Sequence, residues 1–518
     1  MIKNLIVFVG LMPMLSCSVN ELNEKPSVLV REAVSEKQLH KAHLSSDRFE
    51  LKIIPNLILN QKNYLIDFDG DGEDELVTLE ESYSRPNFYK FIFTKKEFKN
   101  LKLESSIHRA SFLKINPRNN HLGVYTFFQN NFMPPGGGFI YKIIINNGVV
   151  TLDERGVFNA KAQMPLSSIV DYEPTGDEDR KPMTIYFHWL KNIQNKLVPV
   201  IDQFDDGGGA RNLNIESKEL ANYGASLCDV DEDNNVEVIL SATSDDDIQF
   251  LDYNSKIGFQ KKRLFPASKK ISGIFASCFF PFNQSYPNYI IGKLNRSYFK
   301  KKKSSGLFNE KGDLIFDFNL NENAEVKNII PLDLNGDVFW DFVIENNGSP
   351  PDTKLEVYVS QNGNYKKLEG INIINPSGVV YSDFNKDGKI DLLFGRSTKR
   401  APFIQKNGGI LFNNIKQRGR SLRIFFDGHK NYKDAEGGII EVITSGGVHK
   451  KVIQYQQGGL SSQSSRFIQF GLGSYRLLKA KLRLGSKEIK YDLRSMNKEG
   501  EITLCPKSRI KKGRTSCG

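Results

Sequence analysis

The sequence predicts an all-β protein, in which a seven-bladed β-propeller is followed by a small β-rich C-terminal domain. Two observations carry this prediction. Four acidic loops share one spacing, and each lies between two short apolar runs that are typical of strands. From residue 49 to residue 416 the pattern recurs in steps of about 50 residues, which is room for four short strands, and such repetition is typical of propellers. An array of β-sandwiches is the alternative architecture.

The four acidic loops begin at Asp67, Asp229, Asp333 and Asp383. Each loop places oxygen-bearing side chains at its positions 1, 3, 5 and 9, and position 7 can add a backbone carbonyl. Because Ca²⁺ prefers about six to eight oxygen ligands, this spacing predicts Ca²⁺ binding at about four sites. A polar turn is the alternative for any single copy, since Asp, Asn and Gly are common turn residues. The candidate ligands are Asp67, Asp69, Asp71, Glu75, Asp229, Asp231, Asp233, Glu237, Asp333, Asn335, Asp337, Asp341, Asp383, Asn385, Asp387 and Asp391.

The distances between the loops leave room for three further units. The last two loops begin 50 residues apart, whereas 104 residues separate the second from the third and 162 separate the first from the second. Three segments align as units that have lost ligand residues, namely 113–124, 169–177 and 278–291. The dipeptides Asn362-Gly363 and Asn407-Gly408 are hairpin signals within the repeated region. The sequence therefore predicts seven units over 49–416.

The first 16 residues predict a lipoprotein signal peptide. A lysine, Lys3, precedes an apolar run that ends in small residues before Cys17. The stretch 14–17 resembles a bacterial lipobox, which implies cleavage before Cys17 and lipid on its thiol; an ordinary signal peptide is the alternative. Residues 17–48 then hold the lipidated Cys and a polar tether. Ser18, by resemblance to Gram-negative lipoproteins, implies an exported protein anchored in the outer membrane, on its periplasmic or its surface side.

The acidic loops resemble the calcium-binding FG-GAP/VCBS repeats of integrin α-chain propellers and of many bacterial surface proteins. Residues 417–490 contain Ser462-Gln463 and, further on, Phe470-Gly-Leu-Gly473. This order of motifs resembles the ASPIC/UnbV domain, which follows such repeats in bacterial relatives of the cartilage acidic protein family. The chain departs from that pattern at Tyr432 and Glu436, where the family usually has Asn and an apolar residue.

The five cysteines divide between lipid attachment and oxidation. Cys17 is assigned to lipid, and residues 491–518 form a basic tail in which Cys505 and Cys517 are a possible disulfide, because exported chains can form them. Cys228 and Cys278 precede the loop positions of neighbouring units. A bridge between these two is an open alternative, but two buried thiols are the expectation.

The charge and the motifs of the sequence limit the classes of function that are expected. The net charge of +11 is expected to reflect a solvated surface, contact with anionic lipid or acidic polysaccharide being the alternative, and the export signal argues against a nucleic-acid partner. No catalytic motif is found, so no enzyme is predicted. The expected function is a calcium-binding cell-envelope lipoprotein that acts as an adhesion or interaction module, with a protein or polysaccharide ligand at the cell surface and a membrane contact through its lipid anchor. The alternative is an exported carbohydrate-active enzyme, a lyase or hydrolase, on a propeller scaffold.

Overall fold

The computed structural model describes residues 48–517 with gaps. The gaps are 55–62, 70, 72, 80–85, 93–96, 105–111, 117–120, 126–137, 159–165, 173–182, 194–195, 205–209, 213–224, 242–246, 255–257, 274, 293–304, 321–323, 349–353, 362–363, 372, 374–375, 397–407, 428–434 and 456–461. The predicted signal peptide, Cys17 and nearly all of the tether lie outside the described residues. Within the described part of the chain, no helix combines the length and the apolar character that a membrane crossing needs.

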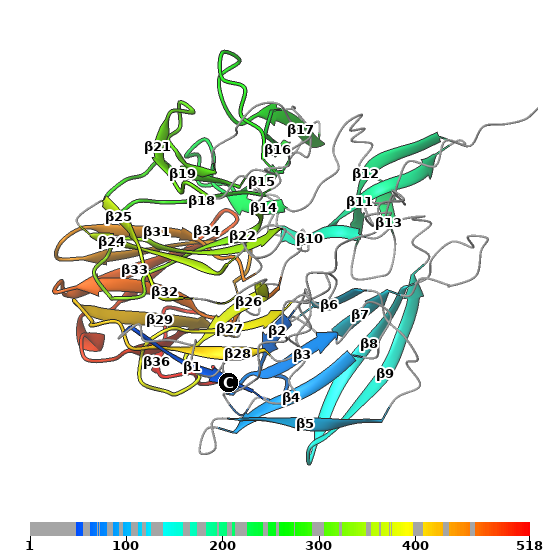
Figure 1. Cartoon of the computed structure of the whole chain (residues 1–518), viewed down its shortest axis with the longest axis horizontal. Coiled ribbons are helices and arrows are strands. Elements are labelled where there is room, and N and C mark those ends of the chain that lie inside the picture. The colour runs from blue at the N-terminus through cyan, green and yellow to red at the C-terminus, as the bar shows by residue number, and fades with distance from the viewer. Residues whose placement is uncertain are drawn as a thin grey trace, which may run out of the picture. The chain divides into compact units, whose positions relative to one another are not determined.

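Strands account for nearly all of the regular structure (Figure 1). One 3-10 turn, η2 (Arg494–Met496), is the only helical element among the described residues. The all-β prediction is therefore confirmed, and the structure divides it into several small sheets.

Residues 49–413 form seven groups of four strands. The first two groups are joined in one eight-stranded sheet, because β5 pairs with β9 in parallel. Those two groups are β2 (Asn63–Ile66), β3 (Glu75–Leu79), β4 (Pro86–Ile92) and β5 (Glu97–Glu104), then β6 (Phe112–Asn116), β7 (His121–Tyr125), β8 (Gly138–Asn146) and β9 (Val149–Phe158). The third and fourth are β10 (Leu166–Tyr172), β11 (Met183–Ile193), β12 (Lys196–Phe204) and β13 (Ala210–Asn212), then β14 (Ala225–Cys228), β15 (Glu237–Leu240), β16 (Gln249–Asn254) and β17 (Gly258–Arg263).

The remaining three groups continue the same order, with each strand antiparallel to the next. The fifth and sixth are β18 (Phe275–Phe279), β19 (Asn288–Gly292), β20 (Gly306–Phe308) and β21 (Leu314–Asp317), then β22 (Ala324–Leu332), β23 (Asp341–Gly348), β24 (Glu356–Gln361) and β25 (Asn364–Lys367). The seventh contains β26 (Pro376–Ser382), β27 (Asp391–Arg396) and β28 (Gly409–Asn413), and its fourth strand is β1 (Phe49–Ile53). The pairing of β1 with β28 brings the two ends of the repeated region side by side (Figure 1).

Burial follows the position of a strand within its group. The second strands β15 and β19 are almost wholly buried, since they carry apolar side chains on both faces. The fourth strand β25 reads Asn-Tyr-Lys-Lys and is mostly exposed. Each group therefore needs cover on both faces of its inner strands, and its outer edge lies in solvent.

Two further sheets follow the repeated region and share one core. The first has the order β32-β29-β35-β36, and the second has the order β31-β30-β33-β34. Buried side chains of both sheets, among them Leu422, Ile440, Leu482 and Ile502, form a single hydrophobic cluster. The strands are β29 (Arg420–Phe426), β30 (Ile439–Thr444), β31 (Val448–Val452), β32 (Ile468–Gly473), β33 (Leu477–Leu484), β34 (Lys487–Asp492), β35 (Glu501–Leu504) and β36 (Ile510–Lys512).

The segment 491–518, expected as a basic tail, belongs to this C-terminal fold. β35 pairs in parallel with β29 and antiparallel with β36, so it is an inner strand of its sheet. Its apolar residues Ile502 and Leu504 are fully buried, which outweighs the basic composition around them. A disulfide joins Cys505 to Cys517 next to this strand.

Cys228 and Cys278 also form a disulfide, so the expectation of two buried thiols is wrong. Their Cα atoms lie 6.1 Å apart because β14 packs beside β18, the first strand of the next group. The bridge closes a loop of 50 residues, for which the chain-entropy model gives a stabilisation of about 4 kcal/mol.

Candidate metal centres

The four acidic loops share one hydrogen-bond pattern. The backbone N–H of loop position 2 donates to the carboxylate at position 9 over 2.7–2.9 Å. These pairs are Phe68 with Glu75, Val230 with Glu237, Leu334 with Asp341 and Phe384 with Asp391. The N–H of position 7 likewise donates to the Oδ1 of position 5 in every loop. The common spacing in the sequence therefore corresponds to a common local structure.

The loops also share backbone conformation. Position 4 has a positive φ in Glu232, Gly336 and Lys386, and position 6 has one in Asn234, Val338 and Gly388. Positive φ is unfavourable for most side chains and is tolerated best by Gly and Asn. These loops therefore share one backbone conformation even where the residue, such as Glu232 or Val338, disfavours positive φ.

Replacing Glu232 by Asn is expected to stabilise the protein by about 1 kcal/mol. The φ of Glu232 is 64°, and Asn adopts this conformation more readily. The side chain is exposed, so losing the hydrogen bond that Ser285 Oγ donates to it should cost less than the relief of backbone strain gains. Urea unfolding at fixed Ca²⁺ measures the change. Glu310→Asn is the matched control, because Glu310 is an exposed turn residue that is not among the residues with positive φ. An equal response of both variants would contradict the explanation.

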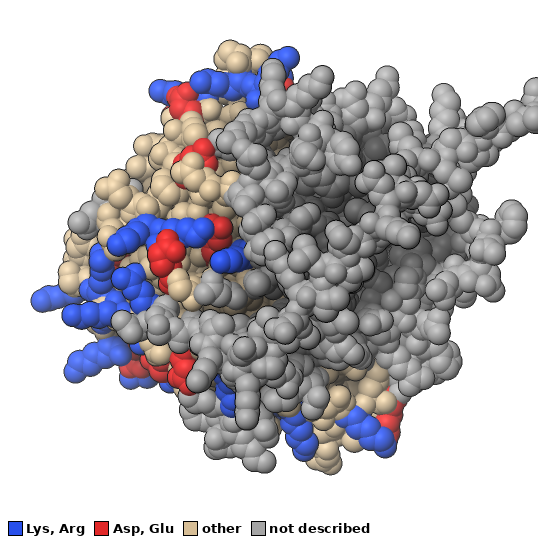
Figure 2. Space-filling view, viewed as in Figure 1, with Lys and Arg blue, Asp and Glu red and all other residues tan. Residues whose placement is uncertain are grey.

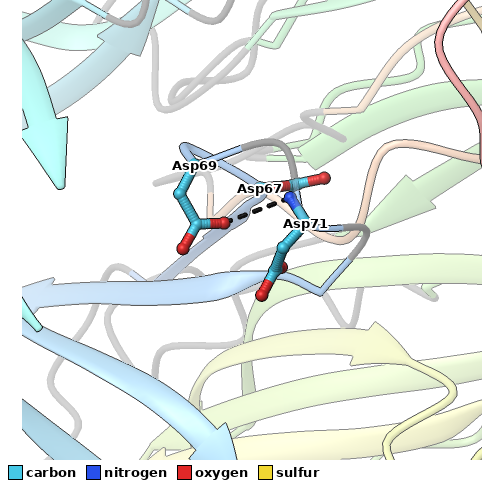
Figure 3. A group of neighbouring side chains, drawn as sticks. All are labelled: Asp67, Asp69 and Asp71. Atoms are coloured by element: carbon cyan, nitrogen blue, oxygen red, sulfur yellow. Dashed lines mark hydrogen bonds between the residues drawn. The ribbon is translucent and has the colours of Figure 1, made fainter. Parts of the chain in front are cut away.

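The first two loops bring carboxylates close enough to share one ion. Asp67, Asp69 and Asp71 can each offer an oxygen, with all three atoms within 4.8 Å of one another, and they project from a single turn (Figure 3). The N–H of Asp71 donates to Asp69 Oδ1 at 3.2 Å. Asp229, Asp231 and Glu237 form the second such group in the described part of the chain.

The second loop provides the clearest evidence for a cation. Asp229 and Glu237 are almost fully buried, and Asp229 Oδ1 has no hydrogen-bond partner among the described residues. Burial, together with the neighbouring Asp231, Asp229 and Asp233 carboxylates, raises the pKa of Glu237 to about 9. A buried group of carboxylates is costly unless a positive charge compensates it. This donor set, made only of oxygen, fits a hard divalent cation such as Ca²⁺.

Lysine ammonium groups contact the same carboxylates. Lys450, on β31, places its Nζ 2.5 Å from Asp229 Oδ2, and both side chains are buried. In the first loop Lys90 Nζ lies 2.9 Å from Asp69, 2.5 Å from Asp71 and 3.2 Å from Glu75. A divalent ion at either loop would compete with an ammonium group for the same oxygens.

The third and fourth loops use their first acid differently. Asp333 is buried and accepts hydrogen bonds from the backbone N–H groups of Asn335, Gly336, Asp337 and Val338. Asp383 likewise accepts from two backbone N–H groups of its own loop, and its Oδ2 lies 2.7 Å from Arg423 Nη1. The first acids of these two loops therefore accept several backbone hydrogen bonds, whereas Asp229 is stabilised by Lys450 and the N–H of Asn234, and its Oδ1 has no hydrogen-bond partner within normal geometry among the described residues.

The C-terminal sheets contact all four loops. Arg514 lies 3.4 Å from Asp67, Lys450 contacts Asp229, and Gln469 exchanges hydrogen bonds with the backbone of Asp333. Arg423 contacts Asp383 of the fourth loop. Sequence spacing could not reveal the partners of the first three loops, because they follow those loops by more than a hundred residues. Lys90 could have been found, since it pairs across the sheet with Glu75.

Figure 2 shows basic and acidic side chains interspersed on the described part of one face, as on an ordinary solvated surface.

The buried side chain of His449 on β31 is expected to make the stability of the protein fall at acidic pH. Its ring packs against Phe282 and Phe470, and burial lowers the pKa of His449 to about 3. The folded pKa lies below the unfolded value, so the stabilisation is complete above about pH 6.5 and is lost as the pH falls below it. At pH 5 the loss is about 2 kcal/mol, because the pKa of His449 is lowered from 6.5 to about 3 on folding.

His449→Phe should therefore flatten the fall of the unfolding free energy between pH 7 and pH 5 by that amount, measured by urea titration. Ile453→Val is the control, because it removes a buried methyl group and should destabilise equally at both pH values. A His449→Phe profile parallel to the wild-type profile would contradict the assignment.

A cavity of about 340 Å³ lies beside the first and fourth loops. Asp74 and Asp383 from the loops, and Arg423, Glu501 and Arg514 from the C-terminal sheet, contribute to its wall. Four phenylalanines complete the wall. Its size lies within the range of small-molecule sites.

The comparisons with known proteins do not support the predicted family. No protein-family model matches the sequence, and no curated protein matches it. One solved structure that matches, described provisionally as a 6-phosphogluconolactonase from Bacteroides fragilis, has 10% identity and a TM-score of 0.40, and covers 64% of this chain and 90% of its own. A similarly described protein from Bacteroides uniformis has 10% identity and a TM-score of 0.39, with 68% and 89% coverage.

A luciferin-regenerating enzyme matches at 9% identity and a TM-score of 0.32, over 71% of this chain and 99% of its own. Because no family model matches the sequence, the resemblance to FG-GAP/VCBS repeats and to the ASPIC/UnbV domain, drawn from the acidic loops and from Phe470-Gly-Leu-Gly473, is wrong. The physical reason is that an oxygen-rich turn between strands is a local solution to cation binding. The short motif does not require the rest of a family's fold.

Proposed function

We propose that this protein is an exported calcium-binding protein in which Ca²⁺ braces the loops of a β-propeller. The observation that carries the proposal is the second loop, where Asp229, Asp231 and Glu237 direct oxygens toward one point and Asp229 Oδ1 lacks a hydrogen-bond partner among the described residues. The shared hydrogen-bond pattern extends the proposal to the first loop. There the ion would be held by Asp67, Asp69, Asp71 and Glu75, and it would offset the mutual repulsion of these carboxylates.

Two features support a seven-bladed propeller as the scaffold. The seven groups each contain four strands in antiparallel order, and β1 completes the last group by pairing with β28. Such pairing of the first and last segments closes a ring and protects the edges of its sheets. On this proposal residues 49–416 form the propeller and residues 417–518 form one β-sheet domain beside it.

Two activities suit this scaffold, an adhesion or interaction module and an exported carbohydrate-active enzyme. The cavity beside the first and fourth loops favours the enzyme, because acids such as Asp74 and Asp383 line it together with Arg423 and Arg514. A flat binding surface would not need these charges to be gathered in a hollow. We place the protein at the outer membrane through a lipid on Cys17, with a polysaccharide as its first candidate ligand and a surface protein as its second.

Calorimetric titration of the metal-free full-length protein with Ca²⁺ tests the metal proposal. At least two sites are expected, and Asp231→Ala should remove one of them. Asp492→Ala is the matched control, because Asp492 is exposed and pairs with Arg494 outside the acidic loops. Calcium binding at the second loop would be refuted if the wild type showed no heat of binding, or if Asp231→Ala showed the same heat of binding as the wild type.

A further inference from the structure

The cavity beside the first and fourth loops is walled by guanidinium groups that are paired with carboxylates. Arg423 Nη1 lies 2.7 Å from Asp383 Oδ2, and its Nη2 lies 2.9 Å from Glu501 Oε1. Arg514 Nη1 lies 2.9 Å from Asp74 Oδ1. These groups come from the loops and from β29, β35 and the segment after β36, so the cavity exists only where the C-terminal sheet meets the loops.

Aromatic rings hold both guanidinium groups in place. Arg423 lies over the ring of Phe467 at 5.7 Å, and Arg514 lies over Phe425 at 5.3 Å. Phe425 and Phe467 contact each other edge to face. Because these two rings also line the cavity, its wall presents apolar carbon beside fixed polar groups.

The burial of the pairs makes this wall costly for a purely structural contact. The side chains of Asp383, Asp74 and Arg423 are only 4%, 7% and 10% exposed, whereas those of Arg514 and Glu501 are 22% and 36% exposed. Removing paired charges from water is often no better than packing apolar residues in their place. Charged groups retained around a hollow of small-molecule size therefore suggest that the hollow binds a ligand.

The pairing selects the chemistry of that ligand. A guanidinium group has five N–H donors and a carboxylate accepts about four hydrogen bonds, so the pair of Arg423 and the partly exposed Glu501 keeps unused capacity. An anion or a cation would have to compete with an existing ion pair, whereas a hydroxyl group can donate to the carboxylate and accept from the guanidinium of one pair. The apolar C–H face of a sugar ring also suits the phenylalanine wall.

We propose that this cavity is a binding site for a neutral saccharide of one or two rings. Glu501 and Arg423 recognise its hydroxyl groups, and its C–H face packs against the apolar part of the wall. The inference rests on the proposed carbohydrate-directed function for the class of its ligand. No group of the second loop takes part, whereas Asp383 belongs to the fourth loop and Arg514 contacts Asp67 of the first.

The test is calorimetric and ligand-detected NMR titration of the full-length protein with glucose, galactose, N-acetylglucosamine, maltose and cellobiose, and with glucuronate and 6-phosphogluconate as charged probes. We expect at least one neutral sugar to bind, and Glu501→Gln to weaken that binding at least fivefold, because it removes an acceptor while Asp383 still pairs with Arg423. Glu488→Gln is the matched control, since Glu488 pairs with Arg483 outside the cavity and should leave the affinity unchanged.

Lys386→Gln is a second variant, because Lys386 is an exposed lysine of the cavity wall and its loss should not affect folding. A smaller but measurable loss of sugar affinity is expected there. Binding of the charged probes alone, of no sugar, or with equal strength in Glu501→Gln and Glu488→Gln would overturn the proposal. Calcium titration of the same samples separates the outcomes: calcium binding without sugar binding refutes only the cavity, and sugar binding without turnover refutes only the enzyme.

Discussion

Adding Ca²⁺ to the metal-free full-length protein is expected to raise its free energy of unfolding by about 2.7 kcal/mol per site, once free Ca²⁺ reaches about a hundredfold its dissociation constant. The physical reason lies in the buried carboxylates. Asp229 and Glu237 are almost fully buried, and each charge raises the cost of the other. A divalent ion converts that repulsion into attraction, and the unfolded chain cannot assemble the same oxygens. Denaturant unfolding in EGTA and in Ca²⁺ measures the difference.

Asp231→Asn tests whether the second loop contributes to this Ca²⁺-dependent stabilisation. Asp231 is exposed, so the substitution spares the packed core and removes one anionic ligand of the second loop. It should lose part of the Ca²⁺-dependent stabilisation while its stability in EGTA stays the same or rises slightly, because like charges are relieved. Asp492→Asn serves as the control outside the loops. Equal Ca²⁺ responses in all three proteins, or none in the wild type, would contradict a bracing role for the metal.

The acidic loops were predictable because their structure is local. The residues that hold the turn together, such as Phe68 and Glu75, are seven positions apart, and the same relation recurs from Leu334 to Asp341. Strand character was also readable, since apolar runs such as 238–240 flank each loop. Four-stranded grouping followed from the interval between the loops.

Long-range pairings were not predictable from spacing. Nothing in the sequence of Phe49–Ile53 indicates that it completes the sheet of β28, because any exposed strand edge of matching length could accept it. The bridge between Cys228 and Cys278 depends on how two neighbouring groups pack. Basic composition concealed the strand Glu501–Leu504, whose few apolar residues decide its burial.

In this site, the candidate ligands were predictable from the local sequence, but most of the cations that contact them were not. Lys90, which contacts ligands of the first loop, comes from a neighbouring strand, but Lys450, Arg423 and Arg514 come from the C-terminal part of the chain. Lys450 follows Asp229 by 221 residues. Arg423 and Arg514 border a cavity that no single motif encodes. A motif can therefore show where oxygens gather, but the charge that balances them depends on the tertiary fold.

Lys450→Met is expected to destabilise the metal-free protein by about 3–5 kcal/mol, because it leaves the carboxylate of Asp229 buried without its partner. Lys450 and Asp229 are both buried, and their Nζ–Oδ2 distance is 2.5 Å. Methionine retains most of the length and apolar stem of lysine, so it removes the ammonium group over Phe280 while leaving most of the surrounding packing in place. Urea unfolding in EGTA measures this loss.

Calcium should offset most of that loss, which is what distinguishes ion competition from ordinary ion pairing. With Ca²⁺ at the second loop, Asp229 gains a positive partner that does not depend on Lys450, so the two proteins should approach each other in stability. The variant should also bind Ca²⁺ more tightly, since no ammonium group has to be displaced. Lys262→Met is the matched control: Lys262 is a half-exposed lysine that pairs with Asp252 on the same sheet, and its loss should cost less than about 1 kcal/mol with or without Ca²⁺. If Lys450→Met is equally destabilised in EGTA and in saturating Ca²⁺, the ammonium and the metal do not share a site, and Lys450 only anchors the C-terminal sheet to the second loop.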